Sequence, residues 1–143
     1  MIIVSLFLAA QTLIALPDTV RAELDKGCAG WQLAPVLPEI AAEIKTRTPS
    51  WPANLIPGDF NADQHTDAAV LVECKGTVEV IAFLSNGPGF TKHVLEPASL
   101  FDARQFLHLI RGEYERDAIG VEYEAVGGHA WVFRDGRWQS VVR

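Results

Sequence analysis

The side chains best suited to chemistry stand at alternate positions of one short segment. Asp59, Asn61 and Asp63 are followed by His65 and Asp67, and a run of apolar residues begins immediately afterwards. Oxygen atoms at this spacing suit Ca²⁺, which takes about six to eight oxygen ligands at about 2.3 to 2.6 Å. We therefore predict a calcium site in which His65 contributes its backbone carbonyl and the other four residues contribute side-chain oxygens.

The second half of this segment differs from an EF-hand loop. An EF-hand places a bidentate Glu at loop position twelve, and the residue at that position, counted from Asp59, is Val70. Apolar and β-branched residues follow Asp67 at once, which is typical of a strand and not of a second EF-hand helix. The loop is therefore expected to lead into a strand.

The segment resembles the calcium loop of FG-GAP and VCBS-type repeats, in which Gly-Asp-Phe-Asn-Gly-Asp-Gly-x-x-Asp precedes a short apolar strand. A single copy lies at residues 58–68, and the matching positions are Gly58, Asp59, Phe60, Asn61, Asp63 and Asp67. The resemblance implies a β-rich, often extracellular module in which these oxygens bind calcium. Ala62 and Gln64 stand where the repeat has Gly. A left-handed backbone at such residues costs on the order of 1 kcal/mol, so weaker binding is expected.

The same residues have a metal-free interpretation. Asp and Asn cluster in ordinary turns because their side chains accept hydrogen bonds from nearby backbone N–H groups. In the calcium interpretation the ion is structural, and its Kd lies at about 10⁻⁴ to 10⁻³ M. In the metal-free interpretation the protein is an extracytoplasmic interaction or inhibitor module with an unknown protein partner.

A catalytic role has less support in the sequence. Glu122 and Glu124 alternate with Val121 and Tyr123, so both carboxylates are expected on the solvated face of one strand. Because glycosidases use two carboxylates, a hydrolase using Glu122 and Glu124 is the less favoured alternative. No nucleophile elbow of the form Gly-x-Ser-x-Gly occurs. We predict a protein that is not an enzyme and has no catalytic residues.

Charge and composition limit the class of partner. The formal net charge is −6 and the pI is about 5.1, which argues against a nucleic-acid-binding surface because such a surface is basic. With 49% hydrophobic residues, the 143-residue chain can bury the core of one domain.

The N-terminal residues have the pattern of a secretory signal. The apolar run over residues 2–16 is short for a membrane span, and cleavage is expected after Ala22. Residues 1–22 are thus predicted to be the signal, and residues 23–143 one mature domain that is secreted or periplasmic and has no stable membrane span. Because no basic residue precedes the apolar run, an uncleaved anchor is the alternative.

Two cysteines remain in the predicted mature chain. In an oxidising compartment Cys28 and Cys74 are expected to form a disulfide. Two buried thiols in a protein that is not exported are the alternative.

The rest of the chain predicts an α+β fold dominated by an antiparallel meander, with one N-terminal helix over residues 35–47. Strands are expected over residues 68–74, 77–84, 91–95, 106–110, 118–123, 130–134 and 138–142. Turns are expected at Lys75 and Gly76, at Gly127 and Gly128, and at Asp135 and Gly136, and a turn or a single helical turn is expected over residues 97–104. Short strands joined by tight turns favour antiparallel pairing.

Overall fold

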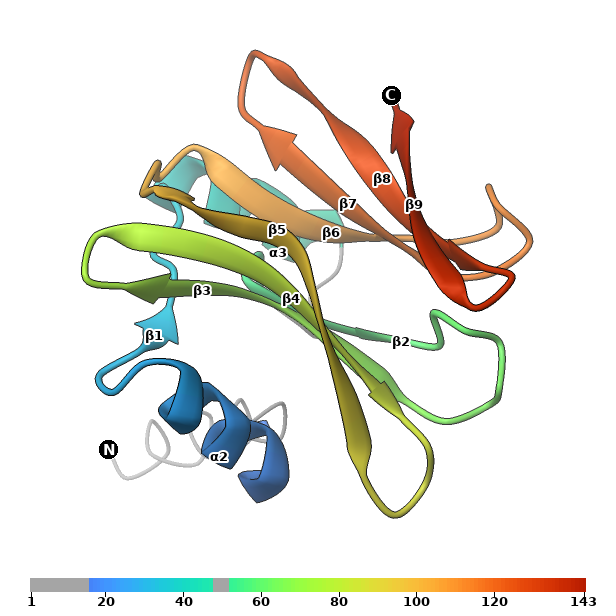
Figure 1. Ribbon diagram of the computed structural model, residues 1–143. Helices are drawn as coiled ribbons and strands as arrows, with labels where there is room; N and C mark the ends of the chain where they lie inside the picture. Colours follow the sequence, from blue (N-terminus) through green and yellow to red (C-terminus); the bar gives the residue numbers. More distant parts are fainter. Residues whose placement is uncertain (1–15, 48–51) are drawn as a thin grey trace, which may run out of the picture.

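The computed structural model describes residues 16–47 and 52–143 and has the predicted α+β class, with two helices and two antiparallel sheets (Figure 1). The helices are α2 (Asp18–Gly27) and α3 (Pro38–Arg47). The strands are β1 (Gln32–Leu33), β2 (Leu55–Gly58), β3 (Asp67–Cys74), β4 (Thr77–Ser85), β5 (Phe90–Leu100), β6 (Gln105–Ile110), β7 (Ala118–Tyr123), β8 (Gly127–Arg134) and β9 (Arg137–Val142). Most of the expected signal segment, residues 1–15, lies outside the described residues.

The first sheet has the order β1-β3-β4-β5, and β2 pairs with the same edge of β3 as β1. Its central hairpin, β3 and β4, closes at Lys75 and Gly76, whose φ angles are 54° and 85°. Positive φ at both central residues is the requirement of the type I′ turn, which matches the twist of the flanking strands. The predicted hairpin is confirmed.

The second sheet is the meander β6-β7-β8-β9. The predicted turn at Asp135 and Gly136 is confirmed, with positive φ at both residues. The expected turn at Gly127 and Gly128 is wrong, because both residues lie in β8. A side chain at Gly128 would collide with the carbonyl oxygen of Val121 in β7, so glycine permits the close approach of these strands. Because β5 and β6 belong to different sheets, the chain forms two sheets where one meander was expected.

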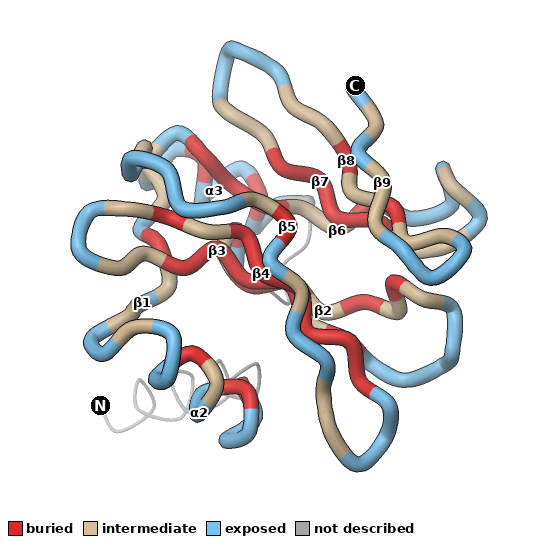
Figure 2. Tube along the Cα trace, viewed as in Figure 1, coloured by how far each residue is buried: buried red, intermediate tan, exposed pale blue. Residues whose placement is uncertain are grey.

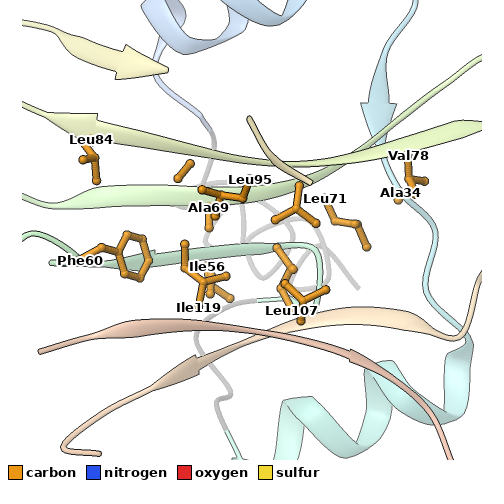
Figure 3. Close-up of a cluster of buried hydrophobic side chains, with 13 residues drawn as sticks. Ala34, Ile56, Phe60, Ala69, Leu71, Val78, Leu84, Leu95, Leu107 and Ile119 are labelled. Atoms are coloured by element: carbon orange, nitrogen blue, oxygen red, sulfur yellow. The ribbon is translucent and has the colours of Figure 1, made fainter. Parts of the chain in front are cut away.

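The two sheets pack face to face, and their facing side chains form the main core (Figure 3). Ala69 and Leu71 of β3 lie opposite Leu107 of β6 and Ile119 of β7. Successive side chains on a strand point to opposite faces, so the intervening Val70 is buried on the other side of the first sheet. The first sheet is therefore covered on both faces.

Helix α2 covers this other face. Val20 and Leu24 of the helix are buried with Val70 and Phe83 of the sheet. Figure 2 shows that α2 has both buried and exposed residues along its length. The sequence pattern did not predict α2, and the expected cleavage point after Ala22 falls inside it. The two buried helix residues thus lie on opposite sides of that point.

Helix α3 lies on the outer face of the second sheet. Ile40 and Ile44 are buried with Ala53 and with Phe106 of β6. The helix begins at Pro38, three residues later than expected. Proline suits this position because its missing N–H has no partner in the first helical turn.

Strand β5 is longer than expected. The turn predicted over residues 97–104 is wrong for its first half, because β5 continues to Leu100. β5 is an edge strand, and its pairing with β4 shifts register on both sides of Glu96, just before Pro97. Proline is tolerated in edge strands and at bulges because no ladder hydrogen bond is required of it there.

The register shifts direct Glu96 toward the second sheet. Its Oε2 accepts a hydrogen bond from Trp131 Nε1 at 2.9 Å, and His129 Nε2 lies 2.6 Å from the same oxygen. These contacts join the free edge of the first sheet to β8.

The predicted disulfide between Cys28 and Cys74 is present, with a Cα–Cα distance of 6.5 Å. It ties the end of α2 to the end of β3, across a sequence separation of 46 residues. Closing a loop of this length contributes about 3 to 4 kcal/mol in the chain-entropy description. A disulfide indicates an oxidising, extracytoplasmic environment.

Candidate metal centre

The acidic segment forms the loop between β2 and β3 (Figure 1). Gly58, the last residue of β2, pairs with Asp67, the first residue of β3. The strand pairing therefore closes the loop at its base and holds Asp59 beside Asp67. The expectation that the loop leads directly into a strand is confirmed.

Three carboxylates come together in this loop. Asp59, Asp63 and Asp67 each place one oxygen so that all three oxygens lie within 4.8 Å of one another. The three side chains differ in exposure: Asp63 is exposed, Asp59 is half-buried, and Asp67 is buried with 1% of its surface accessible. Such a group of oxygen atoms can hold a metal ion.

Two residues in the loop adopt the left-handed backbone expected from the sequence. The φ angles of Ala62 and Gln64 are 60° and 69°, at the two positions where the resembling repeats have Gly. The N–H groups of Asp63 and Gln64 then reach Asp59 Oδ1 and Oδ2 at 3.1 and 2.9 Å, and the N–H of His65 reaches Asp63 Oδ1 at 2.9 Å. Backbone donors therefore orient two of the carboxylates.

Asp67 is fixed by two further backbone donors. Its Oδ2 accepts from the N–H of Phe60 at 2.9 Å, and its Oδ1 accepts from the N–H of Ser85 at 2.7 Å. Burial raises the pKa of Asp67 to about 6; the two hydrogen bonds oppose this shift, and the charges of Asp63 and Asp59 add to it. The pKa of exposed Asp63 is lowered, chiefly by the hydrogen bond from His65 N–H.

Asn61 differs from the carboxylates. Its Nδ2 donates to Asp63 Oδ2 at 3.1 Å. Its Oδ1 is buried and has no hydrogen-bond partner in the described part of the chain. A buried acceptor without a partner costs about 1 to 3 kcal/mol, so native proteins rarely leave one unpaired. A cation among the loop oxygens would satisfy it.

The imidazole of His65 is not a member of the oxygen cluster found among the described residues. The His65 ring lies beside the turn between β4 and β5. A Cβ atom at Gly87 in that turn would be 3.5 Å from His65 Cε1. This placement agrees with a backbone-only role for His65, and the coordination by its carbonyl stays a prediction.

Sequence reasoning did not find two groups that support the loop. Asp117 Oδ2 accepts a hydrogen bond from the N–H of Asp59 at 3.0 Å, and Ser85 supplies the N–H that binds Asp67. Asp117 precedes β7, 58 positions beyond Asp59. No local pattern marks such a contact, which depends on how the two sheets pack.

The other candidate carboxylates lie elsewhere, on the outer side of the second sheet. Glu122 and Glu124 line a pocket of about 260 Å³ between α3 and the β7–β8 turn, together with Glu43 of α3. His108 Nε2 lies 3.0 Å from Glu122 Oε1. A side chain at Gly120 would collide with this imidazole, so the glycine makes room for it. Sequence reasoning did not find His108 or the pocket.

Comparison of the chain with protein-family models, curated proteins and solved structures found no match. Neither helix within residues 16–47 and 52–143 is long and apolar enough to cross a membrane. The interpretation of the site rests on its geometry.

Proposed function

We propose that this is an exported protein, secreted or periplasmic, that binds one structural Ca²⁺ ion in the loop between β2 and β3. The ligands are side-chain oxygens of Asp59, Asn61, Asp63 and Asp67 together with the carbonyl of His65. The ion would offset the repulsion among the three carboxylates. Its binding free energy would then appear as stability of the folded chain.

The observation that carries this proposal is the buried Oδ1 of Asn61, which has no hydrogen-bond partner within residues 16–47 and 52–143. In a metal-free Asx-type turn, side-chain oxygens accept backbone hydrogen bonds, as Asp59 does here through both oxygens and Asp63 through Oδ1. Asn61 does not. Its Nδ2 donates to Asp63 Oδ2, and rotation of the amide on ion binding would bring Oδ1 to the carboxylate oxygens as a ligand.

The donor set favours a hard cation. All side-chain candidates are carboxylate or amide oxygens, which suit Ca²⁺ and Mg²⁺ better than zinc or copper. Ca²⁺ accepts irregular shells, whereas Mg²⁺ demands a near-ideal octahedron and retains several waters. Four side chains and one carbonyl from a single short loop therefore support calcium.

The loop backbone supports weak binding. Ala62 and Gln64 adopt a left-handed backbone that costs on the order of 1 kcal/mol for a residue other than Gly. We expect a Kd of about 10⁻⁴ to 10⁻³ M, which suits extracellular modules and not cytosolic signalling. The disulfide and the signal-like N-terminus support the same compartment.

Thermal and urea unfolding of the oxidised chain, in EDTA and across a Ca²⁺ titration with Mg²⁺ in parallel, tests the proposal. At 10 mM Ca²⁺ the wild type should gain about 1.4 to 2.7 kcal/mol, because the gain grows as RT ln(1 + [L]/Kd). Asp63→Ala and Asn61→Ala should both lose this gain. In EDTA, Asp63→Ala should unfold much as the wild type does, and Asn61→Ala, which removes the buried acceptor, should be no less stable than the wild type. Glu79→Gln, a control in β4 that also removes one negative charge, should keep it.

A calcium response that persists in Asp63→Ala would contradict the ligand assignment. A wild type without any response at millimolar calcium would support the metal-free interpretation, in which the protein is an interaction or inhibitor module. That second candidate is favoured by adjacent apolar residues exposed at the end of β5, Leu100 at 84% and Phe101 at 38%.

The third candidate, a hydrolase, is favoured by the pocket that contains Glu122 and Glu124. The hydrogen-bond contact with His108 occupies one oxygen of Glu122. Loss of a measured glycoside-hydrolase activity in Glu122→Gln and Glu124→Gln variants would establish this function, and a wild type inactive on a panel of glycosides would count against it.

A further inference from the structure

The base of the metal loop is packed against the second sheet. Phe60 is fully buried, and its ring lies 6.2 Å from that of Trp138 in β9, centroid to centroid. A side chain at Gly58 would lie 2.7 Å from Phe60 Cε1 and 3.1 Å from Leu109 Cδ1 of β6. The absence of a side chain at Gly58 therefore lets both groups lie against the end of β2. The loop contacts both sheets although its two ends belong to the first.

A polar contact reaches the loop from the same side. Asp117, immediately before β7, accepts the backbone N–H of Asp59 at 3.0 Å through Oδ2. Its Oδ1 lies 3.9 Å from Arg111 Nε, on the connection between β6 and β7. Asp117 is not one of the residues in the oxygen cluster. Asp117 therefore fixes the backbone of Asp59, whereas the side-chain oxygens of Asp59 accept hydrogen bonds from N–H groups within the loop.

We propose that Asp117 is a positioning residue for the calcium site and couples ion binding to the second sheet. This inference rests on the proposed calcium function. A hydrogen bond from the N–H of Asp59 to a side chain at the start of β7 restrains the position of Asp59 relative to β7, and this restraint needs an acceptor oxygen at residue 117 but not its charge. An ion that fixes Asp59 then also fixes the junction between the loop and the second sheet.

Two variants separate this role from the charge of the residue. Asp117→Ala removes the acceptor, whereas Asp117→Asn keeps an oxygen that can accept the Asp59 N–H but has no charge. Calcium affinity, measured calorimetrically below the unfolding temperature, should fall roughly tenfold in Asp117→Ala, which corresponds to about 1.4 kcal/mol. In Asp117→Asn it should stay within about threefold of the wild type.

Amide hydrogen exchange provides the second readout. In the wild type, calcium should slow exchange in the loop and also in β7. In Asp117→Ala, the slowing should be confined to the loop and β3, and Asp117→Asn should restore it in β7. If Asp117→Ala only destabilised the fold, its unfolding temperature would fall, but calcium would still slow exchange in both the loop and β7.

The outcomes distinguish calcium binding by the loop from the positioning role of Asp117. A wild type that does not respond to calcium overturns the proposed function itself. A wild type that binds calcium, beside an Asp117→Ala variant with the same affinity and exchange pattern, overturns only the positioning role. Should Asp117→Ala not fold, the wild-type pattern decides: calcium protection that does not extend into β7 overturns the coupling.

Discussion

Two carboxylate sites hold this protein together in different ways. At Glu96, the second sheet supplies the partners, because Trp131 Nε1 and His129 Nε2 both reach one carboxylate oxygen. At the loop between β2 and β3, three carboxylates converge and their hydrogen bonds come from backbone N–H groups and the Asn61 amide. The first site is complete within the protein. The second brings three carboxylates together near Asn61, whose buried Oδ1 has no partner among the described residues, and this acidic group could hold a metal ion.

The largest expected effect concerns Asp67, the buried end of the loop. Asp67→Ala removes the acceptor of the N–H groups of Phe60 and Ser85 and leaves both without a partner. We expect a loss of about 2 to 4 kcal/mol in urea unfolding even in EDTA, together with loss of the calcium response. A loss below about 1 kcal/mol in EDTA would show that the loop base contributes little without an ion.

The contrasting variant is Glu96→Ala. It leaves the side-chain N–H groups of Trp131 and His129 without their common acceptor. The side chains of His129 and Glu96 are each about a quarter exposed. We expect a loss of about 1 to 2 kcal/mol that is equal with and without calcium. A calcium-dependent loss would contradict the view that the two sites are independent.

Acidic pH should weaken the loop site. Folding raises the pKa of Asp67 to about 6, above the ordinary value of 3.8. In EDTA, the part of its contribution to stability that depends on protonation is therefore greatest below pH 3.8 and is lost as the pH rises through about 6, while its hydrogen bonds with Phe60 and Ser85 remain. Calcium needs the deprotonated carboxylate, so its affinity should be about tenfold lower at pH 5 than at pH 7.5. Calorimetric titrations at the two pH values measure this, and equal affinities would contradict calcium binding linked to a raised pKa of Asp67.

The smallest expected effect concerns the loop backbone. Ala62→Gly relieves a left-handed residue at φ 60° and should stabilise the folded loop by about 0.5 to 1 kcal/mol in urea unfolding. Gly at a position with negative φ, such as Thr66→Gly, is the matched control and should destabilise. Destabilisation by Ala62→Gly would argue that the strain is absent.

Local patterns were sufficient to predict several elements. The hairpin at Lys75 and Gly76 was predictable because apolar runs flank a two-residue turn that favours positive φ. The loop was predictable because its oxygen-bearing side chains stand at alternate positions of one short segment that leads into β3. Ala62 and Gln64 were predictable as left-handed residues because they replace Gly in a resembling loop.

Elements that depend on tertiary packing were not predictable. Strand β2 contains Pro57 and pairs only at the edge of β3, so its residues resemble a connector. Strand β5 continues past Pro97 because edge strands tolerate proline, and helix α2 begins within the segment whose pattern is that of a signal and extends beyond it. Asp117 meets Asp59 only because the two sheets pack face to face.

The most direct test of the calcium site is a crystal structure of the oxidised protein grown in 5 to 10 times the measured Kd of Ca²⁺, with anomalous scattering to identify the ion. The account predicts one ion within about 2.3 to 2.6 Å of oxygens from Asp59, Asn61, Asp63, His65 and Asp67, with Asn61 Oδ1 among the ligands. An ion bound without Asn61 Oδ1, or no ion in the loop at that concentration, would contradict it.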